Sequence, residues 1–81
     1  MMDYAIYMRS ADRAFWRLNV LLPDEANAHA TAQALVKQAA GRGYATIQAA
    51  VTLTPLDHGG DVGPMFAPVR TLPTAARVYR A

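Results

Sequence analysis

Few side chains in this sequence could carry out acid–base catalysis. It has two histidines and no cysteine, and histidine is the only residue whose ordinary pKa puts its titration between about pH 5 and 8. His29 falls within an expected helix, where Glu25 is the only carboxylate at helical spacing. We therefore interpret His29 as a solvated or edge histidine.

The second histidine lies in the segment Asp57-His58-Gly59-Gly60-Asp61, which joins two carboxylates and an imidazole in an expected loop. Protein metal sites generally take three or four ligands in defined geometry, and no further histidine or glutamate stands at ligand spacing. We interpret the segment as a glycine turn, with a functional loop as the alternative.

Nucleophilic catalysis lacks its usual residues as well. Ser10 is the only serine, and it falls in an expected turn without a neighbouring base, while no GxSxG, Walker A, GxGxxG or HExxH pattern occurs. Glu25, the single glutamate, serves the start of the helix. We expect no catalytic residue, no metal and no cofactor, and hence a protein that is not an enzyme.

Arginine and aromatic residues near the N-terminus make a better case for binding. Arginine between aromatic residues on a sheet face can stack on bases and contact phosphates. The alternative is that these side chains solubilise the sheet face and pack across strands. The candidate partner-binding residues are Tyr7, Arg9, Arg13, Phe15 and Arg17.

A second basic group lies near the C-terminus. Arg70, Arg77 and Arg80, with Tyr79, could anchor an interface or could protect an edge strand from aggregation. Both interpretations predict that these arginines are exposed.

The elements that would position these residues follow from periodicity and turn chemistry. Alternation predicts strands over 4–9, 14–22 and 45–54, and a helix is predicted over 24–40, begun by Asp24 and stopped by Gly41-Arg42-Gly43. Residues 55–68 are expected to form a long loop, followed by a last strand interrupted at Pro73. The predicted fold is α+β in two layers, β-β-α-β(-β), with one alanine-rich helix on one face of a mainly antiparallel sheet of three to four strands.

The same patterns assign residues to faces. We expect the helix to pack through Ala28, Ala32, Leu35, Val36 and Ala39. An apolar row of Trp16, Leu18, Val20 and Leu22 is predicted in the second strand, and Leu18, Val20, Ile47 and Val51 are expected to face the helix. The opposite sheet face is expected to be uncovered and to carry Tyr7, Arg9, Arg17, Asn19, Gln48 and Thr52. Strand order stays open: the third strand could run parallel beside the second or antiparallel beside the first.

Size and composition limit the function further. The chain has 81 residues, 53% of them hydrophobic and 17% charged, with a net charge of +2. We expect one domain over residues 1–81, without a membrane span or secretory signal, acting in the cytoplasm. A domain this short buries only about 60–65% of the surface that its unfolded chain exposes, which favours a homo-oligomer.

The chain resembles the small phage-encoded anti-CRISPR proteins in length and architecture. The likeness lies in a cysteine-free chain, short strands over 4–22, the Pro23-Asp24-Glu25-Ala26 start of an alanine-rich helix, and a strand after Gly41-Arg42-Gly43. The resemblance implies inhibition by contact with a Cas subunit, without chemistry or cofactor. We therefore expect a protein-binding domain; the alternative is a small RNA- or single-stranded-DNA-binding domain.

Overall fold

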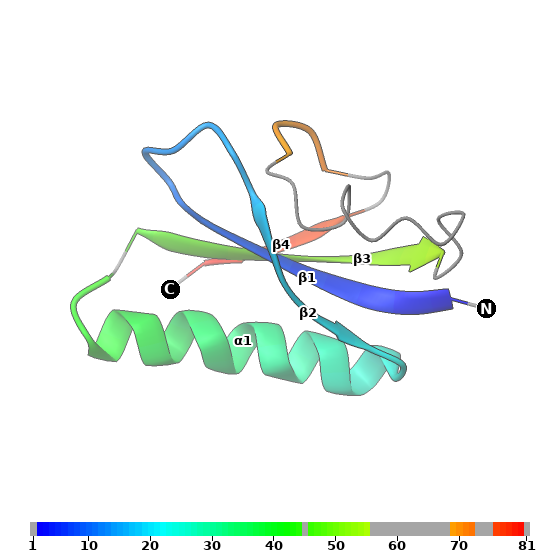
Figure 1. The fold of residues 1–81 in the computed structure, drawn as a ribbon. Coiled ribbons are helices and arrows are strands. Elements are labelled where there is room, and N and C mark those ends of the chain that lie inside the picture. Colours follow the sequence, from blue (N-terminus) through cyan, green and yellow to red (C-terminus); the bar gives the residue numbers. More distant parts are fainter. Residues whose placement is uncertain (1, 45, 56–68, 73–75, 81) are drawn as a thin grey trace.

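Residues 2–44, 46–55, 69–72 and 76–80 are described in a computed structural model of the chain. They form β1 (Met2–Ser10), β2 (Arg17–Leu22), α1 (Glu25–Gly41), β3 (Ile47–Pro55) and β4 (Arg77–Arg80). The strands make one antiparallel sheet in the order β2-β1-β3-β4, and α1 lies along one of its faces (Figure 1). The predicted α+β fold is thus confirmed. Within the described residues, no helix combines the length and the apolar character needed to cross a membrane.

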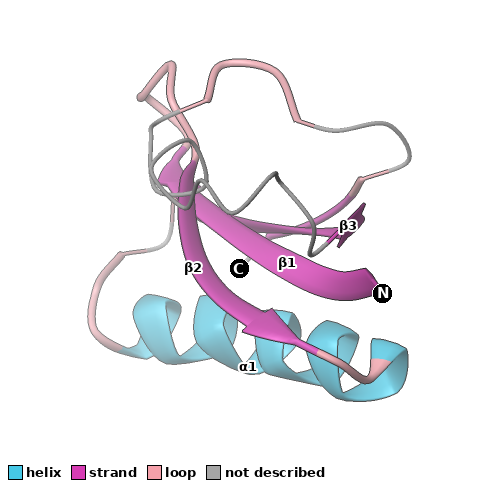
Figure 2. Cartoon of the chain, turned by 45° about the vertical axis from the view of Figure 1, so that its right-hand side comes forward, coloured by secondary structure: helices cyan, strands magenta, loops and turns pink. Residues whose placement is uncertain are grey.

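Strand order is settled by the pairing of β1. It pairs antiparallel with β3 along its whole length, with Ile6 opposite Val51, and antiparallel with β2 on its other side. β2 and β3 therefore run parallel to each other with β1 between them. The connection through α1 joins these two strands and lays the helix across the sheet, as Figure 2 shows.

The helix begins and ends at the predicted capping residues. An Oδ2 atom of Asp24 accepts a hydrogen bond from the Asn27 backbone N–H at 2.7 Å. At the other end, Gly43 has a φ of 93°, and the Tyr44 N–H donates to the Ala39 carbonyl at 2.8 Å. This is a Schellman ending, which needs a left-handed residue after the helix and so favours glycine.

Small side chains let the helix lie close to the sheet. Its buried residues are Ala28, Ala32 and Val36, so two of the three are alanines. Leu35, also predicted in this face, is half-buried and packs at the margin. We call the buried set on this face the helix-side cluster: Ile6, Ala28, Ala32, Val36, Ala49 and Val51.

One extra residue in β2 changes the faces that its side chains occupy. Ile6 pairs with Val20, but the next residue, Tyr7, pairs with Leu18, so Asn19 is inserted between the two pairs. A β-bulge of this kind shifts the alternation of side chains by one residue.

The predicted single apolar row in the second strand is therefore wrong. Val20 and Leu22 pack on the helix side of the sheet. Trp16 and Leu18 pack on the opposite side, so Leu18 does not face the helix as expected. The alternation of the sequence could not show this, because one inserted residue leaves the local pattern of residue types almost unchanged.

The sheet face opposite the helix is covered, which overturns the expectation of an open face. Tyr7 is 7% exposed, Gln48 9% and Thr52 2%. The segment 69–72 lies beside the hairpin formed by β1 and β2, on the side away from the helix (Figure 1). We call the apolar set here the outer cluster: buried Ala5, Tyr7, Trp16 and Ala50, with half-buried Leu18, Leu21, Val69 and Leu72.

A two-residue bridge fixes that covering segment. The Trp16 N–H donates to the Val69 carbonyl at 2.7 Å, and the Val69 N–H donates to the Trp16 carbonyl at 3.0 Å. Trp16 thus joins two segments that are far apart in the sequence. Trp16 and Tyr7 are therefore both buried within a single copy of the chain.

Candidate functional site

The turn between β1 and β2 gathers basic side chains around a pocket. The Arg13 N–H donates to the Ser10 carbonyl at 3.0 Å, which closes the turn as predicted. Beside the turn is a pocket of about 400 Å³, which we call the hairpin pocket. Of the seven described residues that line it, three are arginines and none is acidic. The lining residues are Met8, Arg9, Ser10, Arg13, Ala14, Phe15 and Arg17.

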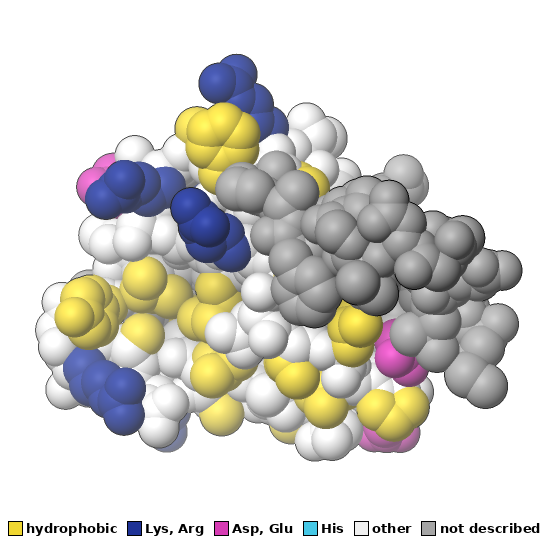
Figure 3. All heavy atoms as spheres, viewed as in Figure 1, with side chains coloured by type: hydrophobic (Ala, Val, Ile, Leu, Met, Phe, Trp, Pro, Cys, Tyr) yellow, Lys and Arg dark blue, Asp and Glu magenta, His cyan; other side chains and the backbone are white. Residues whose placement is uncertain are grey.

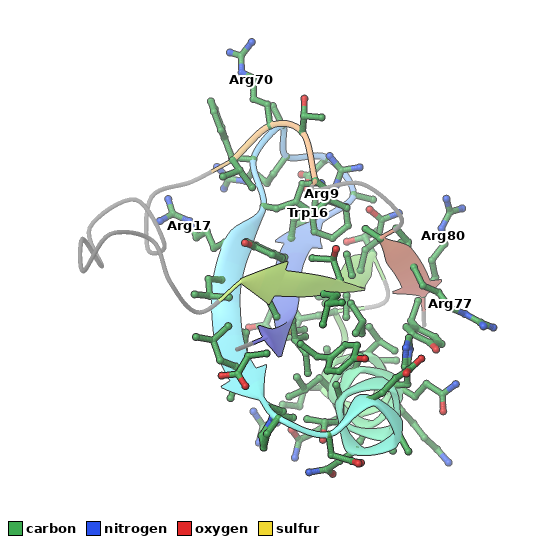
Figure 4. All side chains as sticks on the ribbon, turned by 90° about the vertical axis from the view of Figure 1, so that its right-hand side faces the viewer. Arg9, Trp16, Arg17, Arg70, Arg77 and Arg80 are labelled. Carbon is green, nitrogen blue, oxygen red and sulfur yellow. The ribbon has the colours of Figure 1, made fainter. Side chains whose placement is uncertain are left out.

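Arg9 is held in place by three contacts. Its guanidinium carbon lies 4.3 Å from the centroid of the Trp16 ring, and the two side chains lie side by side in Figure 4. Its Nε donates to Gln48 Oε1 at 3.0 Å, and its Nη1 donates to the Arg13 carbonyl at 3.3 Å. A half-buried arginine fixed in this way loses little further side-chain entropy when it binds a ligand.

Phe15 forms the exposed aromatic part of the same region. Its side chain is 42% exposed, and the Arg70 guanidinium carbon lies 4.9 Å from the centroid of its ring. Arg70 follows Val69, which is bridged to Trp16, so the covering segment brings a fourth arginine to this end of the sheet. Sequence analysis groups Arg70 with the C-terminal arginines. It cannot place Arg70 at the hairpin, because the bridge between Trp16 and Val69 joins residues that are far apart in the chain.

Four of the five predicted partner-binding residues come together here. Arg9, Arg13, Phe15 and Arg17 line one pocket, with Arg13 and Arg17 exposed. Tyr7 is buried in the outer cluster, so its side chain offers almost no surface to a partner. We therefore leave Tyr7 out of the binding surface.

The charge around the pocket is positive on the visible face of the molecule. In Figure 3, Lys and Arg side chains surround a hydrophobic patch at the upper left, over the hairpin, with an acidic side chain at their margin. Asp12, in the turn itself, is exposed but does not line the pocket. Arg17 and Arg70 both point outward from the sheet in Figure 4.

The predicted C-terminal basic group is divided between two places. Arg70 lies at the hairpin, whereas Arg77 and Arg80 lie on β4 at the other edge of the sheet (Figure 4). All three are exposed, as expected. The Arg77 guanidinium carbon lies 5.3 Å from the centroid of the Tyr79 ring.

His29 has a structural partner that the sequence did not indicate. Its Nδ1 lies 2.7 Å from the Tyr79 hydroxyl, a hydrogen bond that joins α1 to β4 across 50 positions of sequence. Its Nε2 lies 4.0 Å from Glu25 Oε1, and the histidine side chain is 28% exposed. His29 is thus an edge histidine that ties the last strand to the helix.

The glycine-rich segment with His58, Asp57 and Asp61 lies outside the described residues. Among the residues that are described, no three histidine, aspartate or glutamate side chains come together around a position for a metal ion.

No protein-family model matches the chain, and no curated protein and no solved structure is significantly similar to it. What the hairpin pocket binds must therefore be inferred from its own side chains. These are one fixed arginine, two exposed arginines and an exposed aromatic ring.

Proposed function

We propose that this chain is a non-enzymatic binding domain whose hairpin pocket engages an acidic surface of a partner protein. The observation that carries the proposal is the convergence of Arg9, Arg13 and Arg17 on one pocket, with no acidic side chain among the described residues that line it. Three like charges in one pocket favour an anionic ligand group.

Guanidinium groups suit carboxylates in particular. Arginine presents planar, paired N–H donors that match the two oxygens of a carboxylate. Arg9 is oriented before binding by its contacts with Trp16 and Gln48, which lowers the entropy cost of the complex. Arg13 and Arg17 are exposed and would speed the encounter with an acidic surface.

The geometry favours a protein over a single-stranded nucleic acid. Binding of single strands on a sheet face depends on exposed aromatic rings that stack on bases. Tyr7 and Trp16 are buried, so neither ring offers such a platform on the described part of the face opposite the helix. Phe15 is exposed, but Arg70 already contacts its ring.

The resemblance to anti-CRISPR proteins gives this proposal its most concrete form. The partner would be a subunit of a Cas effector, which the chain meets in the cytoplasm of the host cell and covers without chemistry. The mild positive net charge fits an acidic or mixed surface on that subunit.

A plasmid-interference assay tests this form of the proposal. Bacteria with an active CRISPR system would be transformed with a targeted plasmid while they express the chain. The chain should restore transformation, and the Arg13→Ala/Arg17→Ala variant should not. The Arg42→Ala variant is the control, because Arg42 is exposed at the end of α1 and does not line the pocket. Equal activity of the double variant and the parent would refute the assigned surface.

A nucleic-acid partner would be recognised by its salt dependence. The affinity for a single-stranded oligonucleotide would then fall on a log–log salt plot with a slope of about −0.7 per phosphate contact.

Self-association also stays a prediction, which light scattering tests against the monomer mass of 8.8 kDa.

A further inference from the structure

A second pocket lies between α1 and β4. Its volume is about 350 Å³, and its helical residues are spaced by three and four positions, so they form one stripe along α1. Val36, Ala40 and the Tyr79 side chain give it apolar walls. The described residues that line it are Gln33, Val36, Lys37, Ala40, Tyr79 and Arg80, and none of these is acidic. We call it the edge groove.

The Tyr79 wall of the groove is already fixed. The Tyr79 hydroxyl is hydrogen-bonded to His29 at 2.7 Å, and the two rings meet edge to face with centroids 5.8 Å apart. Arg77 stacks on the same tyrosine ring. A ligand would therefore meet a formed groove and would not have to order Tyr79.

β4 stands at the edge of the sheet. In the described part of the chain it pairs with β3 on one side, and the sheet order leaves its other side without a neighbouring strand. Such an edge exposes backbone N–H and C=O groups that can pair with an extended peptide. The opposite edge, β2, is interrupted by the bulge at Asn19, which makes it a poorer template.

We propose that β4 and the edge groove bind an extended, acidic segment of a partner protein, which adds to the sheet as a further strand and packs against α1. Backbone pairing with β4 would supply part of the affinity, and an apolar side chain of the segment would enter the groove. Lys37, Arg77 and Arg80 surround this position and are all exposed. Their charges select acidic side chains in the segment.

Charge also disfavours a second copy of this chain as the occupant. A copy seated on this edge would bring its own Lys37, Arg77 and Arg80 close to the same three cations. Like charges brought together at an interface are destabilising. This surface is distinct from the hairpin pocket, so the inference does not rest on the function proposed above.

The test is an NMR titration of the ¹⁵N-labelled chain with a synthetic peptide. The probe alternates glutamate and valine over about six residues, within the usual length of a strand, and has blocked ends. Shift changes should appear at the backbone amides of 77–80 and 33–40. The same peptide with N-methylated backbone amides should lose binding, because it cannot donate to β4. A lysine-for-glutamate peptide should not bind either.

Two charge-reversal variants complete the experiment. Lys37→Glu/Arg80→Glu should weaken binding of the glutamate peptide by about tenfold or more. The control is Arg13→Glu/Arg17→Glu, which changes the net charge by the same amount but at the hairpin. This variant should bind the peptide as tightly as the parent. Amide spectra of both variants report whether they fold. The inference is overturned if the β4 amides do not shift at millimolar peptide, if the N-methylated peptide binds equally well, or if the hairpin variant loses binding and the groove variant keeps it.

Discussion

The guanidinium carbon of Arg9 lies 4.3 Å from the centroid of the Trp16 ring, and this contact links the proposed binding surface to the core. Trp16 is 4% exposed and belongs to the outer cluster. Arg9 therefore contacts the core as well as lining the proposed binding pocket, whereas Arg13 and Arg17 extend from the surface. The three arginines should respond differently to substitution.

Arg9→Ala should lower the free energy of unfolding by about 1–3 kcal/mol. The substitution removes the cation–π contact with Trp16 and the hydrogen bond to Gln48 Oε1. The buried amide oxygen of Gln48 then loses the donor that Arg9 supplied. Urea denaturation measures the change. Arg17→Ala is the control and should stay within about 0.5 kcal/mol of the parent. Equal stability of the two variants would show that Arg9 is not held as described.

Ala32→Leu should destabilise the domain by about 1–3 kcal/mol, because the larger side chain has no room between helix and sheet. Ala32 is 0% exposed in the helix-side cluster. Ala34→Leu makes the same chemical change at an exposed position of α1 and should have little effect. Thermal unfolding of both variants checks the pair. A neutral Ala32→Leu would contradict the close packing of α1 on the sheet.

The two glycines at the end of the helix should respond with opposite signs. Gly43→Ala should cost about 1–2 kcal/mol, since Gly43 has a φ of +93° and alanine is strained there. Gly41→Ala should stabilise by about 0.5–1 kcal/mol, because Gly41 is helical. An added Cβ meets no atom within 4 Å at either site. Chemical denaturation that gave the same sign for both would refute the Schellman ending.

The Tyr4 hydroxyl makes a contribution to the free energy of unfolding that is lost at alkaline pH. Its partial burial, followed by the charge and hydrogen bond of Glu25 and the charge of Asp24, raises the pKa of the Tyr4 hydroxyl above its usual 10.0. Because the folded pKa lies above the unfolded one, this contribution is complete below pH 10.0 and is lost as the pH rises through the folded pKa.

Tyrosinate absorbance of the parent and the Tyr4→Phe variant isolates this titration. The difference curve should have its midpoint above pH 10.0, and Glu25→Gln should move the midpoint downward. A midpoint at or below the usual value would contradict the contact at 3.2 Å between the Tyr4 hydroxyl and Glu25.

Local signals in the sequence predicted much of the fold. The caps of α1 at Asp24 and Gly43 depend on single side chains or a single φ angle, and the structure confirms both. The apolar row Ile47, Ala49 and Val51 likewise faces the helix as its period of two predicts. Each of these features depends on residues only a few positions apart, so it can be predicted from a short stretch of sequence.

The errors have non-local causes. The bulge at Asn19 depends on the pairing of two strands, and it turned Leu18 to the outer face. The bridge between Trp16 and Val69 covers that face and brings Arg70 to the hairpin. No pattern within either segment points to the other. The sequence therefore indicated the arginine-rich hairpin but not the burial of Tyr7 beneath it.

Capture of partners on the immobilised chain, from a nuclease-treated lysate of the cells that carry its gene, tests the central claim most directly. Mass spectrometry would quantify the proteins retained by the parent, by Arg13→Ala/Arg17→Ala and by Arg42→Ala. We predict that a protein partner survives nuclease treatment, is lost with the double variant, and is kept with Arg42→Ala. Retention of the same partner by the double variant, or loss of all capture on nuclease treatment, would contradict a protein-binding role for the hairpin pocket.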